Sequence, residues 1–452
     1  MVPVSRIGVR RRGVKRSLFA ATVAIAMLFG FAAAVSAQTT PETEDQKLTA
    51  TNGDFGDTLG RSVAIDGDTM VVGALGHQDP VQSGGAAYVF TRTPTGWVEQ
   101  AKLTVPDASF FGNAVAIDGE TIVVGDFFSD LTQFGSEGAA HVFTRNGSMW
   151  TERAKLVGSN LNPGDRFGAS VAIDGGTIVV GTSSGDGAVT DDGTAYVFTG
   201  SGAMWTEQAT LFNVVGAELD GFGRSVAIDG GTIVVGATGV SGAFNAEGAA
   251  FVFTGSGSAW AQQATLSGNI AEEFDFFGES VAIDGDTIAV GSTRGPSGGQ
   301  GSVYVFTGAG SAWTEQAELT ASNGDLNDNF GVSVDIDGDT LAVGATHVDS
   351  ATVDFAGSAY VFARSGTTWT ERQLLTASDG ESSTQFGFPV VDNFGFSIGI
   401  DGDTVVVGAL NEDNTGTFEE ATGRGAAYVF GLRVDADGDG FLSDVDCDDG
   451  DN

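Results

Sequence analysis

Short apolar runs separated by turn residues recur along the chain at a regular interval. The stretch SVAIDGGTIVVG occurs at residues 170–181 and again, letter for letter, at 225–236. Each unit contains four runs rich in Val, Ile, Tyr, Phe and Thr, a composition that is typical of β-strands. The first two runs are joined by Asp-Gly and one further residue, which suits the positive φ of a tight hairpin. Each unit is therefore predicted to form four antiparallel strands.

The spacing of the units predicts how they assemble. Four strands at a period near fifty residues are typical of β-propeller blades. Runs such as TIVVG and AAYVF lack polar alternation, as expected for strands covered on both faces, whereas MWTEQATL alternates like a half-exposed outer strand. We therefore predict an all-β fold, a seven-bladed β-propeller of four antiparallel strands per blade that spans residues 43–432. The Gly residues that open the units are Gly60, Gly112, Gly168, Gly223, Gly278, Gly331 and Gly395.

The last unit lacks a fourth strand, and the start of the propeller supplies a candidate for it. The first six units end in a run that carries Trp, but the seventh stops at AAYVFGLRV. The segment TEDQKLT at 43–49 is similar to the fourth run TERAKLV at 151–157. We predict that 43–49 completes the blade of 396–431, which closes the ring without a free sheet edge. The Trp residues are predicted to pack on outer strands, at Trp97, Trp150, Trp205, Trp260, Trp313 and Trp369.

The unit FG-x-SVAIDGDT-x-VVGA…G-x-AYVF resembles the FG-GAP repeat, the blade unit of the integrin α-subunit propeller and of many secreted bacterial proteins. The Phe-Gly element stands in six units and is Leu59-Gly60 in the first. The resemblance implies a propeller and, by analogy, adhesion. Several blades of the family carry a calcium loop between their first two strands. Here that connection is IDGDT or IDGGT, whose carboxylates are too few to supply six to eight oxygens. These residues are predicted to form turns only, at Asp66, Asp118, Asp174, Asp229, Asp284, Asp337 and Asp401.

The N-terminal segment and the charge indicate an exported, acidic protein. A basic start is followed by an apolar run at 17–35 and by small residues at Val35 and Ala37, so residues 1–37 are predicted to be a signal peptide. An uncleaved membrane anchor is the alternative, because the apolar run is long. Removing 1–37 takes away six basic residues and no acidic ones, which leaves 14 Lys and Arg against 59 Asp and Glu, a net charge of −45. Such a surface repels nucleic acid and anionic lipid. We expect a secreted or cell-surface protein without a nucleic-acid partner and without membrane insertion after signal removal.

The C-terminal residues 433–452 form an acidic tail with the spacing of a calcium loop. Alternate carboxylates on a chain that bends at Gly440 surround one hard cation with oxygens. The segment resembles thrombospondin type 3 and dockerin loops and the acidic motifs at the ends of secreted bacterial proteins. We predict Ca²⁺ at this tail only, and the alternative is a solvated acidic tail. The predicted metal ligands are Asp435, Asp437, Asp439, Phe441 through its carbonyl, Ser443 and Asp446.

The sequence favours binding over catalysis. The connections between second and third strands and between units differ widely, whereas the other turns are similar, and individual loops on a rigid scaffold are typical binding sites. His77 and His347 fall in different units, His141 is predicted to be packed, and the chain has no nucleophile elbow, phosphate loop or Cys/His cluster. We predict no catalytic residue and a non-enzymatic adhesion module for an extracellular protein or glycan. A secreted polysaccharide-active enzyme that uses loop carboxylates, or a purely structural surface protein, are the alternatives.

Overall fold

The computed structural model describes residues 41–432 apart from 55, 80–81, 107, 131–134, 243–244, 270–272, 295–298, 350–355, 381, 386–387 and 413–422. The chain divides into two units, 1–37 and 38–452, and every described residue belongs to the second. The predicted signal peptide and the acidic tail lie outside the described residues. Within the described part, no helix is long and apolar enough to cross a membrane.

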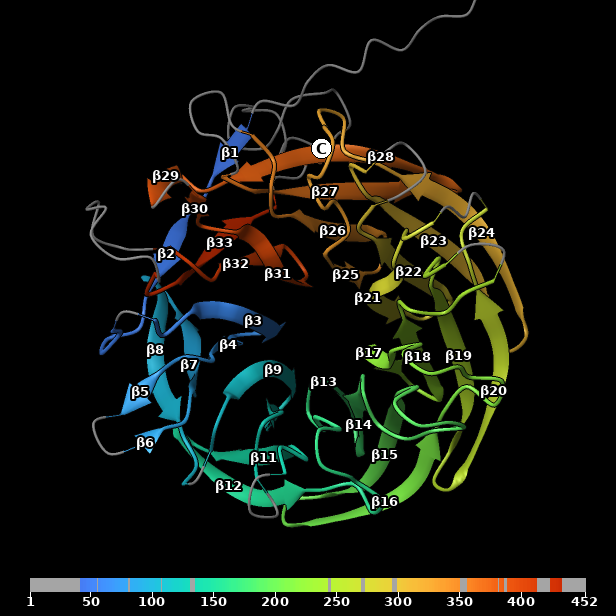
Figure 1. The fold of residues 1–452 in the computed structure, drawn as a ribbon. Helices are drawn as coiled ribbons and strands as arrows, with labels where there is room; N and C mark the ends of the chain where they lie inside the picture. Colours follow the sequence, from blue (N-terminus) through green and yellow to red (C-terminus); the bar gives the residue numbers. More distant parts are fainter. Residues whose placement is uncertain are drawn as a thin grey trace, which may run out of the picture. The chain divides into compact units, whose positions relative to one another are not determined.

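Seven blades, each built on four antiparallel strands, form a ring, with the first strand of each blade at the centre and the fourth at the rim (Figure 1). This arrangement confirms the predicted seven-bladed propeller. Blade 1 contains β3 (Leu59–Asp66), β4 (Thr69–Ala74), β7 (Ala86–Thr93) and β8 (Gly96–Leu103); blade 2 contains β9 (Phe111–Asp118), β10 (Thr121–Asp126), β11 (Ala139–Asn146) and β12 (Met149–Leu156); blade 3 contains β13 (Ser170–Asp174), β14 (Thr177–Thr182), β15 (Thr194–Ser201) and β16 (Met204–Leu211).

The remaining blades repeat this order. Blade 4 contains β17 (Phe222–Asp229), β18 (Thr232–Ala237), β19 (Ala249–Ser256) and β20 (Ala259–Leu266); blade 5 contains β21 (Phe277–Asp284), β22 (Thr287–Ser292), β23 (Ser302–Ala309) and β24 (Ala312–Leu319); blade 6 contains β25 (Ser333–Asp337), β26 (Thr340–Ala345), β27 (Ser358–Ser365) and β28 (Thr368–Thr376); blade 7 contains β31 (Phe394–Asp401), β32 (Thr404–Ala409), β33 (Ala426–Gly431) and β2 (Gln46–Leu48). Two short hairpins, β5–β6 (Gln78–Asp79, Gln82–Ser83) and β29–β30 (Ser382–Gln385, Phe388–Val391), lie in connecting loops.

The N-terminal segment closes the ring, as predicted, but it does so with two strands. β2 pairs antiparallel with β33 and completes blade 7, and Leu48 within it is 2 % exposed. The preceding β1 (Pro41–Thr43) pairs parallel with β28 of blade 6. The prediction that 43–49 forms one strand of one blade was therefore wrong for Thr43. The physical reason is that β28 has a free outer edge, and β1 occupies the hydrogen-bonding groups along it.

The core lies between neighbouring blades, and the Phe-Gly element joins them. Phe167 packs edge-on against Tyr196 and Phe198 of its own blade, with ring centroids 5.3 and 6.0 Å away. Its backbone forms a parallel bridge to Gly138 of the preceding blade. The next residue, Gly168, has φ +92°, and a Cβ there would lie 2.3 Å from the carbonyl oxygen of Ala139. A residue with a side chain would therefore push the two blades apart.

The Trp side chains stabilise the rim, as predicted. Trp97 and Trp369 are 7 % and 8 % exposed. The indole of Trp150 donates to Gln100 Oε1 of the preceding blade at 3.0 Å, whereas that of Trp205 donates to the carbonyl of Gly202 in its own blade at 3.1 Å. Both patterns satisfy the polar indole nitrogen at a partly buried position. The Trp residues are therefore packing elements and do not form an open aromatic platform.

Candidate functional site

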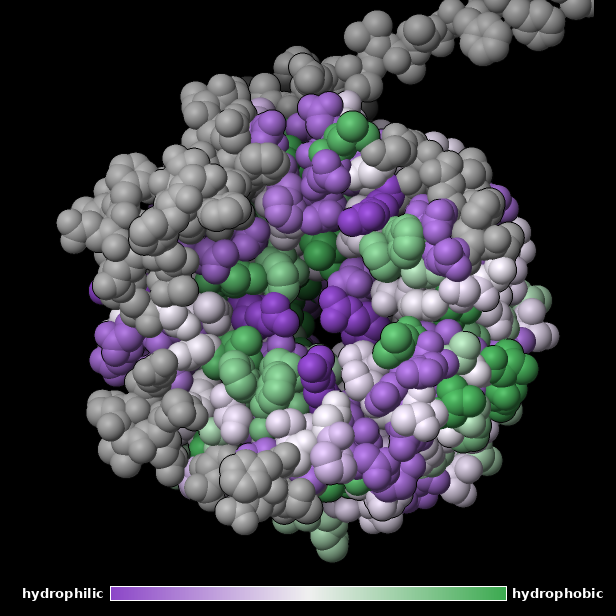
Figure 2. Space-filling view, viewed as in Figure 1, coloured by the Kyte–Doolittle hydropathy of each residue, from purple (hydrophilic) through white to green (hydrophobic). Residues whose placement is uncertain are grey.

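A channel lined by the first strands runs through the ring and has three levels. One opening lies on the side of the loops that connect the blades, has a volume of about 220 Å³ and is called the loop mouth. The other opening lies beside the IDG turns, has a volume of about 280 Å³ and is called the turn mouth. Between them lies a section of about 320 Å³ that is lined mainly by Val, Ala and Ile. Figure 2 shows an opening at the centre of the ring, with hydrophilic residues beside hydrophobic ones. The two mouths differ in chemistry.

The turn mouth is a ring of identical carboxylates that connect the blades. The Asp of each IDG turn accepts a hydrogen bond from the backbone N–H of the Gly in a neighbouring IDG turn, as between Gly230 N and Asp174 Oδ2 at 2.7 Å. The predicted turn formers therefore also brace neighbouring blades, a role that the sequence analysis did not predict. The complete ring pairs Asp66 with Gly119, Asp118 with Gly175, Asp174 with Gly230, Asp229 with Gly285, Asp284 with Gly338, Asp337 with Gly402 and Asp401 with Gly67.

One carboxylate interrupts the apolar middle of the channel. Asp335 stands where blades 1 to 5 have Ala and blade 7 has Gly399. Its Oδ2 accepts from the N–H of Ile400 in blade 7 at 2.9 Å, and its Oδ1 accepts from the N–H of Ile336 at 3.0 Å. Burial, supported by repulsion from Asp337 and Asp401, outweighs these two bonds and raises the pKa of Asp335 to about 7.

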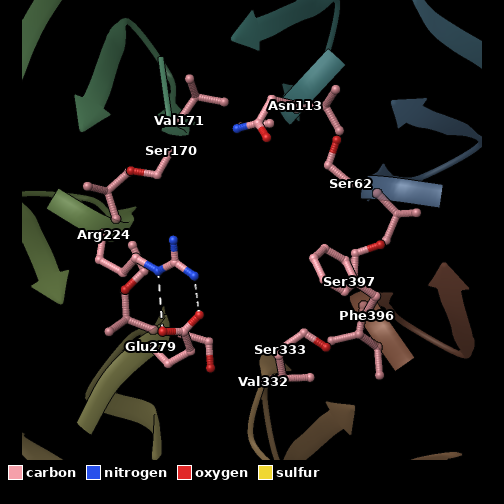
Figure 3. A pocket seen from close by; sticks show the side chains of 18 of the residues that line it. Ser62, Asn113, Ser170, Val171, Arg224, Glu279, Val332, Ser333, Phe396 and Ser397 are labelled. Atoms are coloured by element: carbon pink, nitrogen blue, oxygen red, sulfur yellow. Dashed lines mark hydrogen bonds and ion pairs between the residues drawn. The ribbon is translucent and has the colours of Figure 1, made fainter. Parts of the chain in front are cut away.

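The loop mouth carries a different residue in almost every blade. It is lined by the residue that follows the opening Gly of each unit, and it contains charged, amide and apolar side chains. Figure 3 looks into this mouth, where Arg224 and Glu279 lie together and Asn113 and Phe396 lie elsewhere on the rim. The residues at this position are, in blade order, Arg61, Asn113, Ala169, Arg224, Glu279, Val332 and Phe396.

Hydrogen bonds fix both Arg residues of the loop mouth. Arg224 binds Glu279 through two nitrogens, with Nε 3.2 Å from Oε2, so this pair is bidentate. Arg61 instead donates from Nε and Nη2 to Oδ1 of Asn113, at 3.2 and 3.0 Å. The amide nitrogen of Asn113 donates to the carbonyl of Ala169 at 3.0 Å, which sets the orientation of this amide. The guanidinium of Arg61 also lies 4.7 Å from the ring centroid of Phe396.

The electrostatic surroundings of the two guanidinium groups differ. Burial and, to a smaller extent, the positive charge of Arg224 lower the pKa of Arg61, and Glu279 opposes them. Burial also acts to lower the pKa of Arg224, but the charge of Glu279 and its hydrogen bonds outweigh burial and raise it. Arg61 is therefore a positive charge that has an amide, and no carboxylate, as its partner among the described residues.

Buried carboxylates lie in the loops that enter six of the seven blades. An Asp three residues before the opening Gly accepts from a backbone N–H of its own loop, as Asp165 does from Asn162 N at 2.7 Å and Asp328 from Asp325 N at 2.6 Å. Burial, opposed by this bond, raises the pKa of Asp165 and of Asp328 to about 6. The sequence analysis missed this role, although the pattern D-x-x-G before six of the seven first strands was its signal. The buried members are Asp57, Asp165, Asp220, Asp275, Asp328 and Asp392.

The histidines occupy separate packed positions. His77 is 4 % exposed, with Nδ1 2.9 Å from Asp57 Oδ2 and its other ring nitrogen against Lys102. His141 is 3 % exposed, as expected of a packed residue, and its Nδ1 lies 2.8 Å from Glu152 Oε1. Burial lowers the pKa of His347 in blade 6. Among the described residues, no three His, Cys, Asp or Glu side chains are grouped to hold a metal ion, and the predicted ligands from Asp435 to Asp446 lie outside them.

The repeat that builds these two mouths also defines the relationship to known proteins. Seven segments of the chain match the FG-GAP repeat, at residues 43–90, 97–143, 150–198, 205–253, 260–306, 313–362 and 391–430. The chain belongs to the FG-GAP repeat family. The second to sixth FG-GAP segments begin in the fourth strand of one blade and end in the third strand of the next, so the repeat is offset by one strand from the blade. The segment that starts at residue 43 thus includes β2, the strand that closes the ring.

Comparison with solved structures shows the fold alone. A chain in a crystal structure of the mitotic checkpoint complex is 12 % identical, with 94 % of this chain and 99 % of that chain covered and a TM-score of 0.52. Sqt1 of Chaetomium thermophilum is 15 % identical over 84 % of this chain and 88 % of that chain, with a TM-score of 0.49. A search of curated proteins found no match.

Proposed function

We propose that this FG-GAP propeller is a non-enzymatic binding module that holds an extracellular protein or glycan at the loop side of its ring. One contrast carries the proposal. The turn mouth repeats the same Asp seven times, whereas the loop mouth places charged, amide and apolar side chains on the same backbone position. Identical residues satisfy a structural requirement that is common to all blades. Individual residues on a rigid scaffold suit the recognition of a particular ligand.

The proposal includes export and a calcium-binding tail. Both rest on the sequence, through the signal-like residues 1–37 and through the alternating carboxylates from Asp435 to Asp446. The acidic tail would act as a linker or attachment point, and Ca²⁺ would neutralise part of its charge. The proposal expects binding by the propeller to persist in chelator, because no predicted calcium ligand lines the described loop mouth.

The test is binding of the protein without residues 1–37 to a panel of glycans and matrix proteins, in calcium and in chelator. Two second-to-third-strand loops of equal length, 183–193 and 238–248, are then exchanged between blades 3 and 4. A matched control exchanges the two-residue turns 202–203 and 257–258, which lie between third and fourth strands. The proposal expects the loop exchange to weaken binding and the turn exchange to leave it unchanged. Turnover of a glycan, or equal losses in both exchanges, would contradict it.

A further inference from the structure

The loop mouth combines an excess positive charge with a cavity of small size. The charged residues that line it are two Arg and one Glu, in a chain whose net charge is −39. Glu279 is engaged by both hydrogen-bonding nitrogens of Arg224, so this pair is neutral as a unit. Arg61 supplies the remaining charge. The overall negative charge of the protein attracts cations. The uncompensated guanidinium in this cavity instead favours an anion locally.

Arg61 is oriented before any ligand arrives. Its Nε and Nη2 both donate to Asn113 Oδ1, and Asn113 is itself fixed by the carbonyl of Ala169 in the third blade. The ring of Phe396 lies 4.7 Å from the guanidinium centre on another side. These contacts leave Nη1 without a hydrogen bond among the described residues. A guanidinium that is already held in place loses little side-chain freedom when it binds a planar carboxylate.

The remaining lining residues offer hydrogen bonds to neutral polar groups. Ser62, Ser225 and Ser397 donate to backbone carbonyls of neighbouring blades, so their hydroxyl oxygens keep lone pairs that can accept. The cavity of about 220 Å³ is smaller than the ~300–1,000 Å³ of pockets for drug-sized ligands, so it suits a molecule of about one sugar ring. An acidic peptide side chain carries a carboxylate but no hydroxyl groups to meet these acceptors.

We propose that the loop mouth binds a carboxylate-bearing sugar, a uronic acid residue within an otherwise neutral glycan, with its carboxylate on Arg61. This inference rests on the proposed binding function and specifies its ligand. A polyanionic glycan is disfavoured, because the net charge of the protein repels it while the mouth supplies one excess positive charge. The turn mouth takes no part, since its seven carboxylates repel the same group.

Matched sugars test the proposal. Glucuronic and galacturonic acid differ from glucose and galactose in the carboxylate at C6. Ligand-observed NMR with the protein lacking residues 1–37 measures the affinity for each sugar, and the difference within a pair gives the effect of the carboxylate. We expect the uronic acids to bind at least about tenfold more tightly than the neutral sugars, a difference of about 1.4 kcal/mol, because only the uronic acids form a charge-assisted hydrogen bond. Arg61→Gln should remove this preference and Arg61→Lys should restore part of it. The control is Arg145→Gln, which also removes one positive charge. Arg145 does not line the loop mouth, and its guanidinium donates hydrogen bonds to Thr69 and to the carbonyl of Gly147.

Each outcome decides the proposal. Equal binding of uronic acids and neutral sugars, no uronic acid binding up to millimolar concentrations, or a preference that survives in Arg61→Gln would overturn it. Stronger binding of an Asp-containing peptide than of the uronic acids would also overturn it and would assign the mouth to a peptide. Thermal unfolding of each variant confirms that it is folded. If the panel reveals a ligand that Arg61→Gln still binds, the proposed binding function stands while the assignment of its ligand fails.

Discussion

Asp174 Oδ2 of blade 3 lies 2.7 Å from the backbone nitrogen of Gly230 in blade 4, and the same bond recurs around the whole ring. Asp174→Ala should lower the free energy of unfolding by about 0.5–1.5 kcal/mol, the usual net worth of one such hydrogen bond. Asp174→Asn keeps an acceptor oxygen and should lose less. Denaturant unfolding measures both variants. If Asp174→Ala is as stable as the wild type, the contact between the two turns does not contribute to stability.

Closure of the ring by β2 predicts a large effect of a short truncation. A chain that starts at Thr51 lacks β1 and β2, whereas a chain that starts at Pro41 keeps both. We expect the shorter chain to unfold at a clearly lower temperature, because it exposes the edge of β33 and loses Leu48, which is 2 % exposed. Leu48→Ala in the longer chain should by itself cost about 2–5 kcal/mol. Equal melting temperatures for the two chains would show that the ring closes without this strand.

The elements of the fold could be predicted because each is encoded locally and repeated. Apolar runs such as TIVVG and turns such as IDGG predict strands and hairpins from the local sequence. Their recurrence defines the ring, and the similarity of 43–49 to a fourth strand indicates the closure. The second N-terminal strand, β1, could not be predicted in this way. Its partner is the outer edge of β28, more than 300 residues away, and Pro41–Thr43 carries no strand pattern of its own.

The candidate site was missed for a related reason. The residue after the opening Gly differs from unit to unit. The sequence shows this difference, but it does not show where the seven side chains lie relative to one another. Only the ring brings Arg61 of blade 1 next to Asn113 of blade 2 and places both at one opening with Arg224. The brace between IDG turns was missed similarly, because Asp174 and Gly230 form adjacent turns only after the blades have packed. The sequence showed that the connecting loops differ from one another, but it did not predict the residues that line the loop mouth.

Asp335 predicts a particular pH dependence of stability. Its folded pKa of about 7 lies above the value of ~3.9 for an unfolded Asp, so the folded state keeps a proton that the unfolded state releases. The contribution of Asp335 is therefore most favourable below about pH 4 and is lost as the pH rises to 7. Asp335→Ala and Asp335→Asn should each flatten the fall in stability across this window. Chemical denaturation at several pH values measures it, and a slope unchanged from wild type in both variants would contradict the prediction.

The close contact at Gly168 predicts that the Phe-Gly element between blades 2 and 3 tolerates no side chain at this position. Gly168→Ala introduces a Cβ 2.3 Å from the carbonyl oxygen of Ala139 at a φ of +92°, so both a clash between blades and backbone strain are added. Gly147→Ala is the matched control, because Gly147 has φ +64° in a turn and no atom lies within 4 Å of its Cβ position. The control isolates the strain of a positive φ, which costs a residue with a side chain roughly 1–2 kcal/mol. We expect Gly168→Ala to lose considerably more stability in denaturant unfolding. Similar losses in both variants would mean that the blades adjust to the extra atom, and that positive φ alone explains the glycine.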